Sequence, residues 1–156
     1  MKTFKIEGGH QLKGAIQPQG AKNEALQIIC AVLLTPEEVI INNIPDILDV
    51  NNLIQLLSDF GVEVKKLGLG SFSFKAQNVD LQYLQSETFR KKSASLRGSI
   101  MIIGPLLARF GKAYIPKPGG DKIGRRRLDT HFIGIQKLGA KFNFEYKENF
   151  YRVSAD

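Results

Sequence analysis

The spacing of apolar residues predicts helices and strands that alternate along most of the chain. Apolar side chains recur every three to four residues in four stretches, which is typical of helices with one buried face. The predicted helices cover residues 23–34, 49–60, 95–109 and 127–138. Alternation of apolar and polar residues predicts strands at residues 2–7, 11–18, 39–42, 62–65, 71–76, 112–115, 140–146 and 150–154. The pattern therefore predicts a mixed α/β (α+β) fold, with a polar connecting segment at residues 77–93.

Residues with special backbone preferences mark where several of these elements end. Asp49 stands where the second helix needs an N-cap, and Gly61 where it needs a C-cap. Gly139 follows the last helix in the same way. Pro105 lies inside the third helix and predicts a kink or a break there, because proline lacks the backbone N–H group.

The order helix–strand–helix–strand–strand occurs twice. The segment DFGVEVK at residues 59–65 resembles KLGAKFN at residues 137–143, which divides the chain into units of about 21–88 and 89–156. A duplication predicts that both units pack quasi-symmetrically around one core, although a chance likeness of two α/β units stays open. The two strands predicted within residues 1–20 belong to neither unit. They need a sheet elsewhere, because two short strands alone are marginal in water.

Composition excludes several classes of protein. The chain has 156 residues, of which 43% are hydrophobic and 24% charged, as in globular proteins. We expect no membrane segment, because no apolar run approaches the roughly 20 residues needed to span a bilayer. The N-terminus lacks a signal-peptide core, so we expect a cytoplasmic protein. The single Cys30 is expected to be buried, and no metal site is predicted, because no Cys/His cluster has ligand spacing.

The net charge of +7 leaves two kinds of partner open. Basic domains often bind nucleic acid, but the cations here gather at residues 90–92 and 112–127 without interleaved aromatic residues. No DNA-binding or RNA-binding signature is present. A pocket for a phosphorylated metabolite explains a local basic cluster equally well.

The segment of residues 112–131 is the strongest candidate for chemistry. A Pro-Gly-Gly turn at residues 118–120 precedes Asp121, and three arginines follow at residues 125–127. Glycines permit close approach of a ligand to the backbone. Asp121 is either a turn residue or a general acid, and the second role requires a raised pKa. The equivalent bend of the first unit, at residues 42–48, carries no cation.

Lys22, Arg97 and Arg126 stand at three predicted helix starts. Helix N-termini disfavour cations by up to about 1 kcal/mol, so cations there indicate function more than stability. A cation beside exposed N–H groups can hold a phosphate or a carboxylate. Each of the three could be a solvated surface residue, but together they predict an anion site. His131 has no catalytic partner in the sequence and is expected to be structural.

Several of these motifs resemble one known family. They are Gly20-Ala-Lys-Asn23, Leu96-Arg-Gly-Ser99, Leu138-Gly-Ala140 and the run from Pro118 to His131. In order and spacing they are similar to the UDP-N-acetylglucosamine 1-carboxyvinyltransferases, the enolpyruvyl transferases of peptidoglycan synthesis. The related enolpyruvylshikimate-phosphate synthases share the fold, but their Asn-Ala-Gly-Thr stretch is missing from this sequence.

The resemblance implies an inverted α/β barrel with two domains of three units each, in a chain more than twice this length. Residues 1–20 would then be strands of the second domain, and residues 21–156 two of the three units of the first. The second catalytic lobe would be missing, so we expect this chain to be inactive alone.

The resemblance also implies roles for particular residues. Lys22, Asn23 and Arg126 would bind phosphoenolpyruvate. Asp121 would be the proton donor, in a position where most of the family has cysteine. No cofactor and no metal are implied, and the partners would be the two substrates, without nucleic acid or membrane. The residues that would bind UDP-N-acetylglucosamine are Arg97, Arg126, Arg127, Leu128, Asp129 and Thr130. Arg127 departs from the proline of the family.

Overall fold

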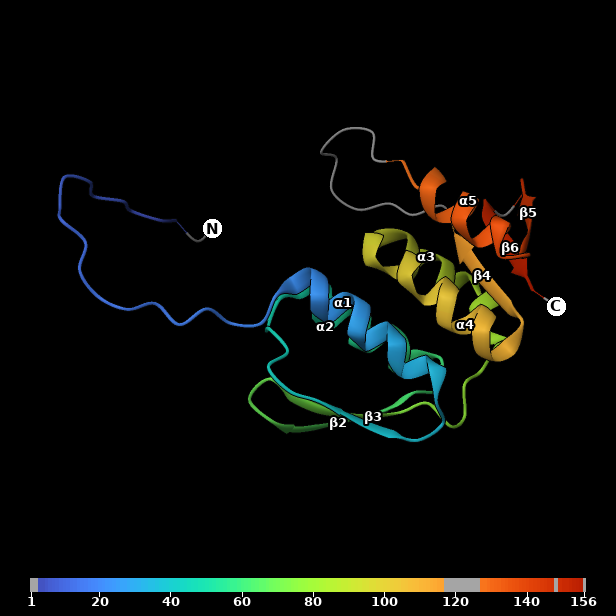
Figure 1. Ribbon diagram of the computed structural model, residues 1–156, viewed down its shortest axis with the longest axis horizontal. Coiled ribbons are helices and arrows are strands. Elements are labelled where there is room, and N and C mark those ends of the chain that lie inside the picture. The colour runs from blue at the N-terminus through green and yellow to red at the C-terminus, as the bar shows by residue number, and fades with distance from the viewer. Residues whose placement is uncertain (1–2, 117–126, 148, 156) are drawn as a thin grey trace.

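A computed structural model describes residues 3–116, 127–147 and 149–155. In these residues two small sheets are packed beside helices (Figure 1). The α-helices are α1 (Lys22–Ala31), α2 (Leu48–Asp59), α3 (Glu87–Ser95), α4 (Ile103–Phe110) and α5 (Asp129–Lys137). Short 3-10 helices are η1 (Val32–Leu34), η2 (Tyr83–Gln85) and η3 (Arg97–Ile102). The strands are β1 (Glu38–Ile41), β2 (Glu63–Gly68), β3 (Ser71–Lys75), β4 (Lys112–Pro116), β5 (Lys141–Glu145) and β6 (Phe150–Ser154).

The two sheets have the same topology. Their strand orders are β1-β3-β2 and β4-β6-β5, and every pairing is antiparallel. The central strand of each sheet carries a fully buried residue, Phe74 in β3 and Val153 in β6, which is paired on both sides. The predicted mixed α/β fold is therefore confirmed. The division into two repeated units stays a prediction, because the second unit has two α-helices, α3 and α4, before β4, whereas α1 alone precedes β1.

The core lies where α1 and α2 pack together and meet η3. The apolar stripe predicted for the first helix is buried at Ala25, Leu26, Ile29 and Cys30. Burying one leucine or isoleucine side chain contributes about 1.5–3 kcal/mol, so this stripe fixes which face of α1 turns inward. Burial also raises the pKa of the Cys30 thiol well above its usual range, which makes it inert.

The Arg109 side chain, at the end of α4, joins the second unit to the first. Its Nη1 atom donates hydrogen bonds to the carbonyl oxygens of Leu33, Thr35 and Ala76, at 3.1, 3.2 and 2.7 Å. The guanidinium also lies over the ring of Phe110, 4.8 Å from its centroid. One cation thus satisfies a carbonyl group within η1, one directly after η1 and one directly after β3.

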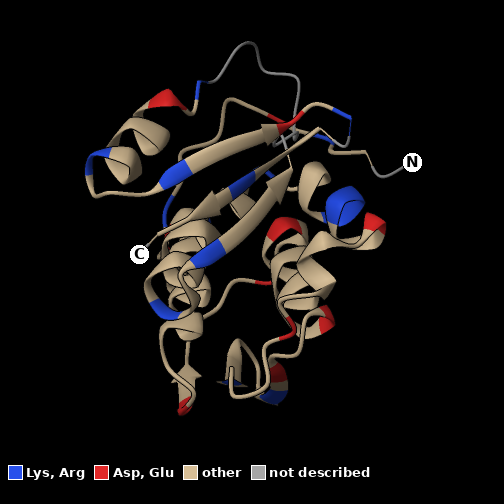
Figure 2. Cartoon of the chain, turned by 90° about the vertical axis from the view of Figure 1, so that its right-hand side faces the viewer, with Lys and Arg blue, Asp and Glu red and all other residues tan. Residues whose placement is uncertain are grey.

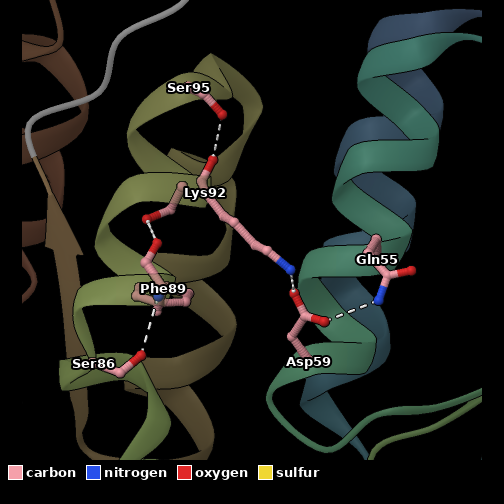
Figure 3. A network of polar contacts seen from close by, with 7 residues as sticks. Gln55, Asp59, Ser86, Phe89, Lys92 and Ser95 are labelled. Atoms are coloured by element: carbon pink, nitrogen blue, oxygen red, sulfur yellow. Dashed lines mark hydrogen bonds and ion pairs between the residues drawn. The ribbon is translucent and has the colours of Figure 1, made fainter.

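A second link between the units runs from α3 to α2 (Figure 3). Lys92 donates a hydrogen bond of 2.6 Å to Asp59, which also accepts one of 2.9 Å from Gln55. This contact raises the pKa of Lys92 above its ordinary value. Helix α3 itself begins where the Ser86 hydroxyl accepts a hydrogen bond from the N–H group of Phe89.

Two predictions about the first 20 residues are wrong. Residues 3–20 contain no strand, and their apolar side chains are almost fully exposed, for example Phe4 at 91% and Leu12 at 94%. Figure 1 shows this segment leading away from the helices. Alternation alone does not form a strand, because the backbone N–H and C=O groups need a neighbouring strand. Whether another sheet supplies that neighbour stays a prediction.

Three local predictions also need correction. Asp49 is not the N-cap of α2, because the helix begins at Leu48 and Asp49 lies in its first turn. The segment 77–93 is not a plain connection, since α3 occupies residues 87–95 and buries only Phe89 and Ser93. The helix predicted for residues 95–109 is not continuous but is divided into η3 and α4, which agrees with the break predicted from Pro105. Pro105 lies in the first turn of α4, where no N–H group is needed.

We predict that Arg109→Met destabilises the protein by about 3 kcal/mol, because three carbonyl groups lose a charged hydrogen-bond donor. Urea unfolding followed by circular dichroism measures the change. Arg152→Met is the matched control: its guanidinium lies 3.7 Å from Glu145 at the surface, so its loss is expected to cost less than about 1 kcal/mol. Equal effects of both substitutions would contradict the bridging role of Arg109.

Candidate functional site

A cleft of about 450 Å³ opens where several helix starts converge. Lys22 is the first residue of α1, Asp49 lies in the first turn of α2, and Arg97 begins η3. The segment before α5 adds Arg127 to the wall. The remaining lining residues are Asn23, Leu26, Gln27, Ser95, Gly98, Ile100, Met101, Leu128 and His131. The cleft is thus polar at the helix starts and apolar where α1 packs against η3.

Two glycines allow close approaches beside the cleft and within it. A Cβ atom on Gly20 would lie 1.9 Å from the carbonyl oxygen of Asn43, so only glycine fits at this position, directly before the N-cap residue Ala21 of α1. A Cβ atom on Gly98 would lie 3.1 Å from Cδ1 of Leu26. The Gly-Ala-Lys-Asn and Leu-Arg-Gly-Ser motifs therefore place Lys22 and Arg97 on elements that touch.

Positive charge dominates the described wall of the cleft, but it is partly paired. The ammonium group of Lys22 forms an ion pair with Asp49, and both side chains are about two-fifths exposed, at 41% and 40%. Arg127 is paired through its Nε atom with Asp129. Cations beside exposed helix N–H groups suit a phosphate or a carboxylate. Chemically, the cleft can bind an anionic small molecule.

Most of the predicted binding residues within the described part of the chain come together in this cleft. Lys22, Asn23, Arg97, Arg127 and Leu128 all line it, although they come from both units. The predicted convergence of cations at helix starts is therefore seen for Lys22 and Arg97. Their individual roles toward a substrate stay predictions.

The other predicted site residues lie elsewhere or outside the description. Asp129 and Thr130 begin α5 and do not line the cleft, and Thr130 is exposed. Asp121, Arg126 and the glycine turn at residues 118–120 lie outside the described residues. The proton-donor role of Asp121 is therefore still a prediction from the sequence.

Three lining residues were missed as site residues. Asp49 was interpreted as a helix cap, His131 as structural, and Gln27 was not singled out. Helical spacing offered a signal for Gln27, which lies four residues after Asn23 in α1. Residues four apart share one helix face, so Gln27 follows Asn23 into the cleft.

The remaining charge is spread over the molecule. Figure 2 views it from the side of the second sheet and shows a cation on each strand, the exposed Lys112, Lys141 and Arg152.

Among the described residues, no group of three or more His, Cys, Asp or Glu side chains is placed to hold a metal ion. Across the same part of the chain, no helix has the length and hydropathy to cross a membrane.

Comparison with solved structures identifies the class of fold. The chain superposes on the enolpyruvyl transferase NikO from Streptomyces tendae with a TM-score of 0.72 at 21% identity, covering 96% of this chain and 31% of that one. It superposes less closely on the EPSP synthase from Acinetobacter baumannii, with a TM-score of 0.52 at 10% identity, covering 91% and 32%. The fold is that of the enolpyruvyl transferases.

Sequence comparison then gives the family. The family model described as EPSP synthase (3-phosphoshikimate 1-carboxyvinyltransferase) matches residues 6–155, so the chain belongs to this family. Three relatives are named UDP-N-acetylglucosamine 1-carboxyvinyltransferase. They come from Bacteroides fragilis, Bacteroides thetaiotaomicron and Porphyromonas gingivalis, at 69%, 67% and 58% identity over 99–100% of this chain. The chain spans about a third of their length, 36% in each case.

We predict that Gly20→Ala destabilises the protein by about 1–3 kcal/mol, because the new methyl group collides with the backbone of Asn43. Thermal unfolding measures the loss. Gly8→Ala is the control, since no atom lies within 4 Å of a Cβ at that position. An unchanged melting temperature for Gly20→Ala would show that this close approach does not fix the start of α1.

Proposed function

We propose that the full-length protein that carries this chain transfers the enolpyruvyl group of phosphoenolpyruvate to the 3′-hydroxyl of UDP-N-acetylglucosamine and releases phosphate. This is the first committed step of peptidoglycan synthesis, and we infer that it takes place in the cytoplasm. The observation that carries the proposal is the cleft, which unites Lys22, Asn23, Arg97 and Arg127 from two units. The names of the relatives at 58–69% identity support the same reaction.

Charge complementarity supports the choice of substrates. Phosphoenolpyruvate carries a phosphate and a carboxylate, and UDP-N-acetylglucosamine carries a diphosphate. We assign phosphoenolpyruvate to Lys22, Asn23 and Arg126, and the nucleotide sugar to Arg97 and the stretch of residues 126–130. Preorganised cations in a partly desolvated cleft lower the energy of the charge that develops as phosphate leaves.

The proposed reaction is an addition followed by an elimination. Asp121 donates a proton to C3 of phosphoenolpyruvate, and the sugar hydroxyl adds at C2. The hydroxyl loses its proton as it adds. In the elimination, a proton is removed from C3, the double bond between C2 and C3 forms again, and the bond from C2 to the phosphate oxygen breaks, so that phosphate leaves with the bonding electrons. For Asp121 to donate, its pKa must be raised, for example by burial against the substrate.

The acceptor is the point at which the two family names differ. The family description names 3-phosphoshikimate, whereas the names of the relatives at 67% and 69% identity contain UDP-N-acetylglucosamine. Identity of 58–69% over the whole chain favours the nucleotide sugar. The relatives are almost three times as long, and we propose that their remaining part supplies a second catalytic lobe, so this chain alone is expected to be inactive.

We predict that the full-length protein releases phosphate only when phosphoenolpyruvate and UDP-N-acetylglucosamine are both present. Shikimate 3-phosphate in place of the nucleotide sugar is expected to give no release. A phosphate assay with each substrate omitted in turn measures this. Phosphate release with shikimate 3-phosphate would reassign the acceptor. No release, together with duplex-DNA binding that falls steeply with salt, would support a nucleic-acid-binding protein instead.

We predict that Asp121→Ala lowers kcat of the full-length protein by about 10²–10⁴-fold, the usual contribution of a positioned acid. Asp121→Cys keeps a proton donor and is expected to remain active. It should also become sensitive to fosfomycin, the epoxide that alkylates the cysteine of the family at this position. Asp46→Ala, in the equivalent bend of the first unit, is the control. Near-normal turnover of Asp121→Ala would contradict the role of Asp121 as the proton donor.

A further inference from the structure

The ion pair between Lys22 and Asp49 lies in the wall of the cleft. Lys22 opens α1 and Asp49 lies in the first turn of α2, so the pair links two helices across the cleft wall. Both residues line the cleft. Asp49 does not cap α2, because Ile47 holds the N-cap position and no side chain makes a capping hydrogen bond there.

We propose that Asp49 is a positioning residue for carboxyvinyl transfer, whose carboxylate holds the Lys22 ammonium group where the anionic substrate meets it. This inference rests on the proposed function, because it takes Lys22 as a ligand of phosphoenolpyruvate. Asp49 itself need not touch the substrate.

The flexibility of lysine is the first reason. Its ammonium group ends a four-carbon stem with many rotamers, and a free lysine at a helix start spends most of its time in water. Asp49 is attached to a rigid helix that contacts α1, and a carboxylate in the first turn of α2 is itself favoured by the helix dipole. The pair therefore fixes a flexible cation to a rigid neighbour.

Repulsion within the cleft is the second reason. Lys22 shares the described lining with the cations Arg97 and Arg127, and Asp49 supplies the one carboxylate among those lining residues. Like charges in one cleft push the most flexible of them outward, toward water. Asp49 offsets that repulsion at Lys22, and the two side chains stay about two-fifths exposed, so a ligand can reach the ammonium group.

A carboxylate beside an anion site could also compete with the substrate for Lys22, and the two roles predict opposite signs. If Asp49 positions Lys22, its removal weakens binding of phosphoenolpyruvate. If it competes, its removal tightens binding. The placement of the pair between two helices favours positioning. A carboxylate held by a second helix can fix the ammonium group in place, whereas competition with a substrate requires no such support.

The test uses Asp49→Asn, which keeps the shape of the side chain and removes its charge, in the full-length protein. We expect KM for phosphoenolpyruvate to rise about tenfold, with kcat and the KM of UDP-N-acetylglucosamine changed less than about threefold. Asp49→Glu restores the charge and is expected to recover part of the loss. Glu87→Gln is the matched control, because it breaks the exposed ion pair with Lys91 away from the cleft.

A double-mutant cycle with Lys22→Ala separates positioning from a general structural role. Asp49→Asn is expected to have no further effect once Lys22 is absent, because it acts through that residue. Full additivity of the two substitutions, or an unchanged or lowered KM in Asp49→Asn, would overturn the proposal. Thermal unfolding of each variant shows that the comparison is made between folded proteins.

Calorimetric titration with inorganic phosphate separates failure of this inference from failure of the proposed function. If the protein releases no phosphate from the two substrates, yet Asp49→Asn weakens phosphate binding only when Lys22 is present, the function is wrong and the positioning role stands. If the reaction proceeds and Asp49→Asn binds phosphate and phosphoenolpyruvate as the wild type does, the function stands and the positioning role falls.

Discussion

The hydrogen bonds of Arg109 are the constraint on which the arrangement of the two units depends. One guanidinium in α4 binds three carbonyl oxygens of the first unit, at 2.7–3.2 Å. These carbonyls lie in η1, directly after it and directly after β3, and leaving them unpaired would be costly. Helix α4 continues directly from η3, and η3 packs against α1. Residues of both η3 and α1 line the cleft.

Helix starts on opposite sides of this junction give the cleft its charge. A lysine or arginine at a helix N-terminus opposes the helix dipole, so the fold accepts a small loss of stability at each one. The ion pair of Lys22 with Asp49 reduces that loss without neutralising the site. The proposed anionic substrate would supply the remaining negative charge, so residues that are unfavourable to the isolated fold would favour its complex.

The sequence predicted the parts of the fold that depend on local pattern. The stripe of α1 and the mixture of helices and strands follow from the spacing of apolar residues, and they were found as predicted. Helix α3 was missed because it buries only Phe89 and Ser93, so its sequence carries no apolar stripe. Asp49 was taken for a cap because sequence alone does not show that Lys22 lies opposite.

The burial of Cys30 has a practical consequence for experiments on this chain. It is the single cysteine of the sequence, it is 1% exposed, and its raised pKa keeps it in the unreactive thiol form. Reagents that attack thiolates are therefore expected to leave Cys30 unmodified. Two cysteines introduced at surface positions on opposite walls of the cleft can carry a pair of labels at those positions alone, so the distance between them can be measured as substrates are added.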